Sequence, residues 1–444
     1  MHAKRSASGF LALLSAPGLT AQDRMSLDDA LALAAKNQPA ITRAEETLES
    51  ARAREREARS SFLPTVGLDA AYARVVPQRG QEMDFEPYLP IDVKVPSSSE
   101  SSVDIALGMQ MTVFDAGRRS IKSDIARLGV EASGIDLARA KRSIAFLTAR
   151  TFYALLFFGE EAKVLDDQVA ALGRHLDEAR GREETGSSTH YDVLATQVQM
   201  ANVEKQSIEA KNRYAKAKVF LSRLTNQTGD FEVVGELRPP EPSSDGEPAV
   251  LSAIADREDI KLSLVAEREA RLELRLAELT NYPRIASSLR TGYKNGILTY
   301  DNSDVDKLMF NWSVGITLSM PIFDGLLARN RQSEARAALA AQTASGEELA
   351  RTAETEARQA IMDLISSREQ TRTCLAQLEK AEEAVGIARI QYSIGAFTNL
   401  QFLDSHAALE QAKLDTTRAL YQETLCELAL KQILGKEAGD PVAK

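Results

Sequence analysis

The chain has 444 residues, long enough for two or three ordinary domains, and its apolar content of 44% is typical of a sequence that folds. Its 54 Lys and Arg against 64 Asp and Glu give a formal net charge of −10, which argues against a nucleic-acid-binding protein. It contains no phosphate-binding loop, no Gly-x-Ser-x-Gly, no His-Glu-x-x-His and no Cys-x-x-Cys, so we expect no enzyme, no cofactor and no metal site.

The chain begins with the pattern of a secretory signal peptide over residues 1–21. Lys4 and Arg5 form a basic start, residues 10–14 are a short apolar run, and residues 19–21 offer small side chains for cleavage. Beyond them no run approaches the roughly 18 apolar residues that a membrane-spanning helix needs. If the chain crosses a membrane, it must therefore do so as a closed β-barrel, the other structure that pairs all its backbone groups in lipid.

The first repeat, residues 22–236, opens with a helix of about 35 residues that starts near Ser26, with Asp29 as its capping-box partner. Two strands follow at about 65–75 and 103–114, each close to the length of roughly 11 residues that a tilted strand needs to cross a bilayer. The second strand alternates strictly. Its large apolar side chains all face one way: Val103, Ile105, Leu107, Met109, Met111 and Val113.

A very long helix, residues 117–184, and a second helix, residues 187–228, complete the first repeat around a turn at Gly186. The long helix would measure roughly 100 Å at about 1.5 Å per residue. Its apolar positions recur at alternating intervals of three and four residues, which predicts coiled-coil packing. They are Leu137, Ala140, Ile144, Leu147, Thr151, Ala154 and Phe158.

A proline-rich linker, residues 237–248, separates this repeat from a second one, residues 249–435, and a tail follows at 436–444. The second repeat is predicted to contain a helix, strands at about 284–294 and 309–320, a long helix at 325–393 and a helix at 398–434. Its long helix has the same coiled-coil spacing of three and four residues, from Ala353 to Tyr392. Matching motifs recur about 209 residues apart, namely Phe114-Asp115 with Phe323-Asp324 and Gly186 with Gly395. This order indicates an internal duplication, because the period is too long for a solenoid repeat.

Aromatic residues support a membrane location for the strands. Tyr72, Tyr293, Phe310 and Trp312 fall near the same predicted end, as expected at a lipid–water interface. Four strands cannot close a barrel alone, whereas two copies would supply eight and three copies twelve. The alternative is a soluble β-sandwich with one buried face, which we disfavour because four strands are too few and a soluble sheet would leave open edges.

The two cysteines, Cys374 and Cys426, fall on helices that fold back at Gly395. Cys374 should then lie beside a residue near 416, about 15 Å from Cys426, whereas a disulfide needs Cα atoms within about 7 Å. We therefore expect two free thiols. The histidines show no metal-ligand spacing, so packed or solvated side chains are expected at His175, His190 and His406.

These motifs together resemble the TolC-like outer-membrane efflux protein family. The likeness covers the chain from Ser26 to about Gly435 and rests on the duplicated order of elements and on short motifs. The motifs are Pro64 and Pro283 before each first strand, Phe114 to Gly117 and Phe323 to Gly325 after each second strand, Gly186-x-x-Thr189-x-x-Asp192-Val193-Leu194, and Tyr392-Ser393-Ile394-Gly395-x-x-Thr398.

The resemblance implies a mainly α fold with β, in which a homotrimer builds a 12-stranded outer-membrane β-barrel continued by a long periplasmic barrel of coiled-coil helices. It implies a passive exit duct of a tripartite efflux or type I secretion system, located in outer-membrane lipid. Its partners would be a periplasmic adaptor protein and an inner-membrane pump. Alternatives are a periplasmic coiled-coil scaffold or the adaptor subunit itself.

The resemblance also implies site residues near the turns. Tyr392 matches a tyrosine of the periplasmic gate and Asp404 matches an acidic residue facing the pore, while Phe397 and Gln401 depart from the arginine and the second aspartate expected there. Adaptor docking is expected at Gly186, Thr189, Asp192, Leu194, Gly395, Thr398 and Leu403. Simpler roles remain open: the glycines as helix C-caps, Asp192 and Asp404 as first-turn acids, and Tyr392 as a packing residue.

Overall fold

The computed structural model describes residues 23–74, 101–237, 254–295 and 307–436. These residues form two compact units. The first comprises the segments up to Glu45, Asp136–Lys261 and from Leu349 onward, and the second comprises Glu46–Ile135 and Leu262–Glu348. The predicted signal peptide, most of the predicted linker and residues 437–444 of the predicted C-terminal tail lie outside the described residues. No helix in the described ranges is long and apolar enough to cross a membrane.

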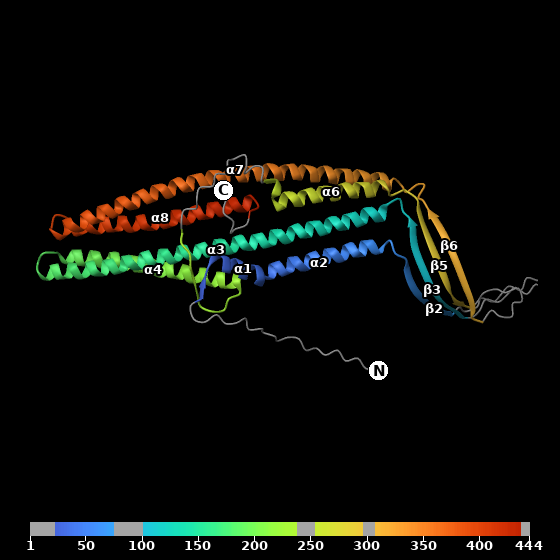
Figure 1. Ribbon diagram of the computed structural model, residues 1–444, viewed down its shortest axis with the longest axis horizontal. Coiled ribbons are helices and arrows are strands. Elements are labelled where there is room, and N and C mark those ends of the chain that lie inside the picture. The colour runs from blue at the N-terminus through green and yellow to red at the C-terminus, as the bar shows by residue number, and fades with distance from the viewer. Residues whose placement is uncertain (1–22, 75–100, 238–253, 296–306, 437–444) are drawn as a thin grey trace, which may run out of the picture. The chain divides into compact units, whose positions relative to one another are not determined.

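The same order of helices and strands occurs twice along the chain (Figure 1). In the first half the order is β2 (Thr65–Arg74), β3 (Ser101–Phe114), α3 (Arg118–Glu184) and α4 (His190–Thr225). In the second half it is β5 (Arg284–Lys294), β6 (Met309–Ser319), α7 (Leu327–Ser393) and α8 (Asn399–Ile433). The helix ahead of these strands is α2 (Pro39–Ser60) in one half and α6 (Glu258–Glu278) in the other.

The first predicted helix is wrong in one respect, because the structure divides it into α1 (Leu27–Asn37) and α2. Ser26 caps α1 in a capping box with Asp29, as predicted. Gln38 then leaves the helical conformation with ψ 120°. The physical cause is Pro39, since a proline disfavours helical geometry at the residue before it and is well tolerated as the first residue of a new helix.

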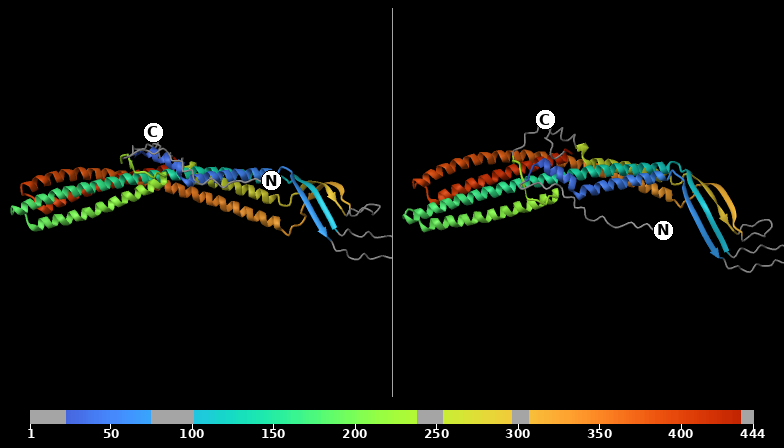
Figure 2. Two further views of the ribbon diagram at one scale, coloured as in Figure 1. Left: turned by 90° about the horizontal axis from the view of Figure 1, so that it is seen from below. Right: turned by 60° about the horizontal axis from the view of Figure 1, so that its bottom comes forward.

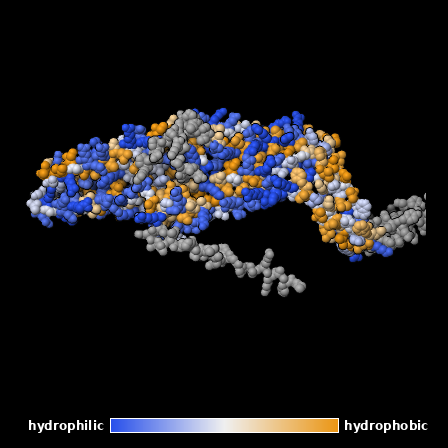
Figure 3. All heavy atoms as spheres, viewed as in Figure 1, coloured by the Kyte–Doolittle hydropathy of each residue, from blue (hydrophilic) through white to orange (hydrophobic). Residues whose placement is uncertain are grey.

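The second unit contains a four-stranded antiparallel sheet in the order β2-β3-β5-β6. The register pairs Leu68 with Leu107, Leu107 with Thr291 and Thr291 with Trp312, so residues of one face continue across all four strands. Hydrophobic side chains gather over these strands in Figure 3. β2 and β6 are the outer strands, and each has one edge without a strand partner in the described part of the chain.

Gly292 permits the closest approach within this sheet. A Cβ atom at Gly292 would lie 2.1 Å from the Ile105 carbonyl oxygen and 2.6 Å from the Ala106 Cα atom. Both neighbours are backbone atoms of β3, so no side-chain rotation can relieve the clash. Only glycine fits this position of β5.

In the first unit, α4 folds back on the part of α3 from Asp136 onward, and α8 folds back on the part of α7 from Leu349 onward. The two helical hairpins, α3–α4 and α7–α8, run side by side in Figures 1 and 2. The coiled-coil seam predicted along α7 is confirmed in this unit, because every seam residue from Ala353 to Tyr392 is buried or half-buried. The seam predicted along α3 is wrong at Leu147, which is 37% exposed because the helix buries Phe146 and Ala149 there instead. The fully buried members are small, with Ala353 and Ala357 both at 0% exposure. Small seam residues allow helices to pack closely.

Two short strands that the sequence did not predict complete the first unit. β1 (Asp23–Met25) pairs in parallel with β4 (Phe231–Val233). Their side chains Met25 and Phe231 join a buried cluster with Phe152, Leu155 and Leu221. Three-residue strands are too short to leave an alternating pattern in a sequence, so only tertiary packing reveals them.

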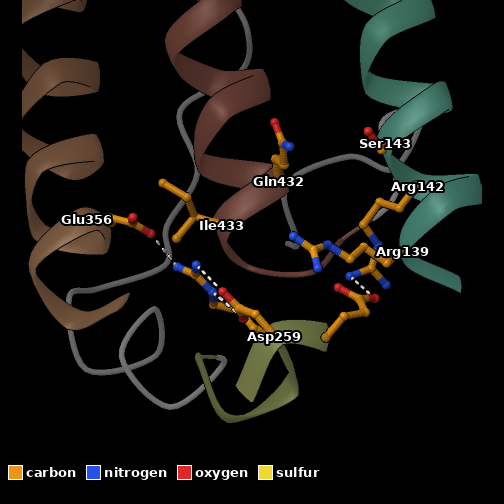
Figure 4. A pocket seen from close by; sticks show the side chains of 9 residues that line it. Arg139, Arg142, Ser143, Asp259, Glu356, Gln432 and Ile433 are labelled. Carbon is orange, nitrogen blue, oxygen red and sulfur yellow. Dashed lines mark hydrogen bonds and ion pairs between the residues drawn. The ribbon is translucent and has the colours of Figure 1, made fainter. Parts of the chain in front are cut away.

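An arginine cluster fixes the start of α6 in the first unit (Figure 4). Arg257 forms ion pairs with Asp259 at 2.7 Å and with Glu356 of α7 at 2.8 Å, and Arg142 of α3 pairs with Glu258 at 2.5 Å. The hydrogen bonds to Asp259 raise the pKa of Arg257. These pairs join the beginning of α6 to two long helices.

The cysteine prediction is confirmed. Cys374 and Cys426 are both free. The Thr416 hydroxyl donates a hydrogen bond of 3.2 Å to the Cys374 carbonyl, which places residue 416 beside Cys374 as the fold-back at Gly395 predicts.

Candidate functional site at the helix turns

Each hairpin turns on a glycine with a left-handed backbone. Gly186 has φ +74° and Gly395 has φ +76°. In both turns the next residue donates a backbone hydrogen bond five residues back, from Ser187 to Arg182 and from Ala396 to Gln391, each 2.8 Å. This is the Schellman ending of a helix, and a side chain would be strained at either glycine. The C-cap role foreseen for both glycines is therefore confirmed.

Capping boxes start both following helices. Thr189 and Asp192 exchange side-chain and backbone hydrogen bonds at α4, and Thr398 and Gln401 do the same at α8. Partial burial raises the pKa of Asp192, but hydrogen bonds from Thr189 and Ser188 outweigh it and hold the pKa below its usual value. The family resemblance implies an acidic residue at position 401. Gln401 stands there instead and completes the capping box that begins α8.

An aromatic cluster joins three helices just behind these turns. Tyr392 of α7 stacks on Phe402 of α8, with ring centroids 5.0 Å apart and planes inclined by 27°. His175 of α3 packs against Phe402 at 4.4 Å and against Tyr392 at 5.2 Å, and His406 lies 4.9 Å from Phe402. Tyr392, Phe402 and His175 are all buried. Tyr392 is therefore a packing residue that joins α7 to α3 and α8.

Arg182 of α3 adds a charged contact to this cluster. Its guanidinium lies over the Tyr392 ring at 4.3 Å from the centroid, and its Nη1 atom donates to the Tyr392 carbonyl at 3.3 Å. The resemblance places the arginine partner of the tyrosine at position 397, where Phe397 is half-buried in the turn. Here an arginine reaches Tyr392 from the other hairpin. The sequence did not single out Arg182, because arginines are common in the last turn of a helix.

Asn399 connects α8 to both helices of the other hairpin. Its Oδ1 atom accepts from His175 Nε2 at 2.7 Å, and its Nδ2 atom donates to the Asp192 carbonyl at 3.2 Å. This pairing makes Nε2 the protonated nitrogen of neutral His175 and leaves the buried Nδ1 atom without a hydrogen bond. Burial lowers the pKa of His175, because a charged ring would need a second buried acceptor.

The remaining predicted residues divide into exposed and buried ones. Asp404, Thr189 and Thr398 are exposed, and Leu194 is 46% exposed. Leu403 corrects the prediction of a docking role: it is 9% exposed and belongs to a core cluster with Leu165, Leu172 and Val203, so its side chain is not available to a partner. Three exposed apolar residues that were not among the predicted docking residues also lie beside the turns: Tyr191, Ile394 and Leu400.

The four predicted interface aromatics lie together on one face of the sheet. The register pairs Tyr293 with Phe310, Tyr72 with Val103 and Trp312 with Thr291, which are three successive rows of the same face at one end. Tyr293 and Phe310 contact edge to face at 5.6 Å. Each of the four side chains is more than half exposed.

Comparison with known proteins agrees with this architecture. The chain is 22% identical to the outer membrane protein TolC of Salmonella enteritidis over 393 residues, covering 85% of this chain and 75% of that protein. It is 23% identical to the pyoverdine export outer membrane protein OpmQ of Pseudomonas putida over 427 residues, covering 92% and 85%.

Solved structures share the fold. A membrane protein from Pseudomonas aeruginosa superimposes with a TM-score of 0.79 at 18% identity, covering 94% of this chain and 92% of that one. The Campylobacter jejuni CmeC outer membrane channel gives a TM-score of 0.75 at 18% identity, covering 94% and 87%. The family model described as outer membrane efflux protein matches residues 30–227 and 250–436, and the chain therefore belongs to the outer membrane efflux protein family, as its TolC-like motifs predicted.

Proposed function

We propose that three copies of this chain form a passive exit duct in the outer membrane, continued by a helical tunnel in the periplasm. The duct would serve a tripartite efflux or type I secretion system, in which an adaptor protein links it to an inner-membrane pump that supplies the energy. The observation that carries the proposal is the four-stranded sheet, which has one mainly apolar face and two outer strands, each with an edge that no other strand of the described residues pairs with.

The apolar face is suited to lipid. Its side chains are among the most exposed hydrophobic ones described, for example Leu68 at 71%, Val314 at 64% and Ile316 at 78%. The opposite face of the same strands is polar or small, with Asn311, Ser313 and Thr317 on β6. A water-soluble protein would not leave such a face uncovered, whereas lipid outside and water inside satisfy both faces.

The open edges of β2 and β6 require further copies. Within a membrane every backbone group must be paired, so β6 of one copy would join β2 of the next until the sheet closes. Three copies give twelve strands, the number implied by the family resemblance. Tyr72, Tyr293, Phe310 and Trp312 would then recur around one rim as an aromatic belt at the lipid–water interface.

The aromatic cluster behind the turns is suited to a gate. Arg182 and His175 of one hairpin hold Tyr392 and Asn399 of the other, so the α7–α8 hairpin can move only when these contacts break. Exposed Asp404 would present one carboxylate per copy to the constriction, with Phe397 and neutral Gln401 completing its lining. Tyr191, Leu194, Ile394 and Leu400, with the turns at Gly186, Thr189, Gly395 and Thr398, offer the adaptor an exposed apolar surface.

Planar-bilayer recording on the purified oligomer tests the proposal. We expect discrete conductance steps and an apparent mass of three chains in detergent. Carbonate extraction of membranes provides the contrast with a periplasmic coiled-coil scaffold or an adaptor. A protein that is released by carbonate and gives no conductance would contradict the duct and favour the scaffold.

A further inference from the structure

The polar face of the sheet carries a column of basic residues on β5. Residues on this face are fixed by register: Asp104 pairs with Lys294, Gly108 with Arg290, and Arg290 with Ser313. Arg284 lies on the same face near the other end of the strand, paired with Ser319. The alternation of β5 therefore places three of its cations on the face that would line the lumen.

Two carboxylates oppose these cations on the same face. Asp104 of β3 forms an ion pair with Arg290 at 3.0 Å and a second one with Lys294 at 3.9 Å. Asp69 of β2 pairs in register with Ala106, also on the polar face. Three cations against two carboxylates leave a net charge of +1 per chain on the described part of this face, whereas the whole sequence carries −10.

The surroundings leave these cations open to the lumen. Arg290 and Lys294 keep 46% and 45% of their side chains exposed despite the ion pairs. The cross-strand neighbours of Arg290 are Gly108, Gly67 beyond it and Ser313, none of which has a bulky side chain. The Asp69 Oδ2 atom lies over Gly108, 3.8 Å from the place of a Cβ atom there. Arg284 is the charged residue of a polar hollow of about 230 Å³ lined also by Gln110, Ala286, Ser287, Ser288, Thr317 and Ser319.

We infer that Arg284, Arg290 and Lys294 make the strand-built part of the duct locally cationic, so that it favours cargo carrying anionic groups such as carboxylates or sulfonates. This inference rests on the proposed function, because it assigns the polar face to the lumen. Three-fold repetition would set nine cations against six carboxylates on this wall. This positive charge would lie in the strand-built part of the duct, through which solutes leave. It is opposite in sign to the ring of Asp404 carboxylates proposed for the gate.

Thiol labelling next to Arg290 tests the inference independently of the gate. Cys374 and Cys426 are replaced by Ser, and a single cysteine is introduced by Ser313→Cys on the lumenal face or Val314→Cys on the lipid face. Intact cells are treated from outside with the anionic sulfonatoethyl and the cationic trimethylammonium-ethyl methanethiosulfonates. The readout is the reaction rate with the anionic reagent divided by the rate with the cationic reagent. This ratio is then divided by the same ratio for a free thiol in solution.

We expect Ser313→Cys to react, with a normalised ratio above one that favours the anionic reagent. A unit charge about 6 Å away in water changes each rate about three-fold in opposite directions, so Arg290→Gln should lower the ratio about ten-fold at low salt. Asp104 keeps Lys294 as its partner in this variant. Lys294→Gln is a second test, and Arg74→Gln, which removes the same charge from the apolar face, is the matched control.

The outcomes separate the two proposals. A ratio that neither Arg290→Gln nor Lys294→Gln changes would overturn the cationic wall while leaving the duct intact. A Ser313→Cys thiol that does not react, beside a Val314→Cys thiol that reacts readily, would mean that the faces are reversed and would overturn both proposals. A ratio that falls with both lumenal variants and not with Arg74→Gln supports the inference.

Discussion

Replacing Arg182 should open the proposed gate. In the structure this side chain makes two contacts with Tyr392, a cation–π contact at 4.3 Å and a hydrogen bond of 3.3 Å to the carbonyl. At a half-buried position the two together contribute about 1.4 kcal/mol per chain, which is about ten-fold in the ratio of open to closed states. If three hairpins open together, Arg182→Gln should raise this ratio about a thousand-fold.

Single-channel recording in planar bilayers measures this effect. We expect Arg182→Gln to show larger or more frequent openings than the wild type, and Arg182→Lys, which keeps the charge but loses the planar stacking group, to lie between them. Arg180→Gln is the matched control, because Arg180 makes only an exposed ion pair of 3.7 Å with Asp177 on its own helix. Openings of Arg182→Gln that match those of Arg180→Gln would refute the reasoning.

Three further predictions follow from named contacts. Burial lowers the pKa of His175 and of His406 below the usual 6.5, so the unfolded chain takes up more protons as the pH falls through 6.5. The Tm should therefore fall between pH 7.5 and pH 5, and an equal fall in a His175→Gln, His406→Gln double variant would contradict this cause. Gly292→Ala should abolish heat-resistant oligomer on semi-native gels because of the clash with β3, whereas Gly67→Ala, which has nothing within 4 Å of the added methyl, should not. Thiol titration of the denatured, unreduced protein should give two thiols per chain, and a value near zero would disprove the free state of Cys374 and Cys426.

The periodic elements could be predicted because their burial or exposure follows a simple rule. Strict alternation over 103–114 reports a strand with different surroundings on its two sides, and β3 spans Ser101–Phe114. The 3.5-residue seam of α7 likewise reports a continuous helical contact, and the structure buries Ala353, Leu364 and Tyr392 along it.

The contacts between distant segments could not be predicted in the same way. Arg182 meets Tyr392 across 210 residues, and no local pattern distinguishes it from neighbouring arginines. Leu403 lies near the start of α8, where the local sequence does not distinguish a buried residue from an exposed one. It is buried because α8 packs against the other hairpin. The paired strands β1 and β4 are stabilised by tertiary contacts of Met25 and Phe231 rather than by their own sequence.

Trp312 tests the central claim, that one face of the sheet meets lipid. It is the single tryptophan of the chain, it is 68% exposed, and it lies on the apolar face of β6. Its fluorescence can be measured in proteoliposomes against phospholipids brominated near the headgroup end of their acyl chains and against aqueous iodide. Strong quenching by the brominated lipid with little effect of iodide is the result we predict. Quenching by iodide without any effect of the brominated lipid would contradict the membrane duct.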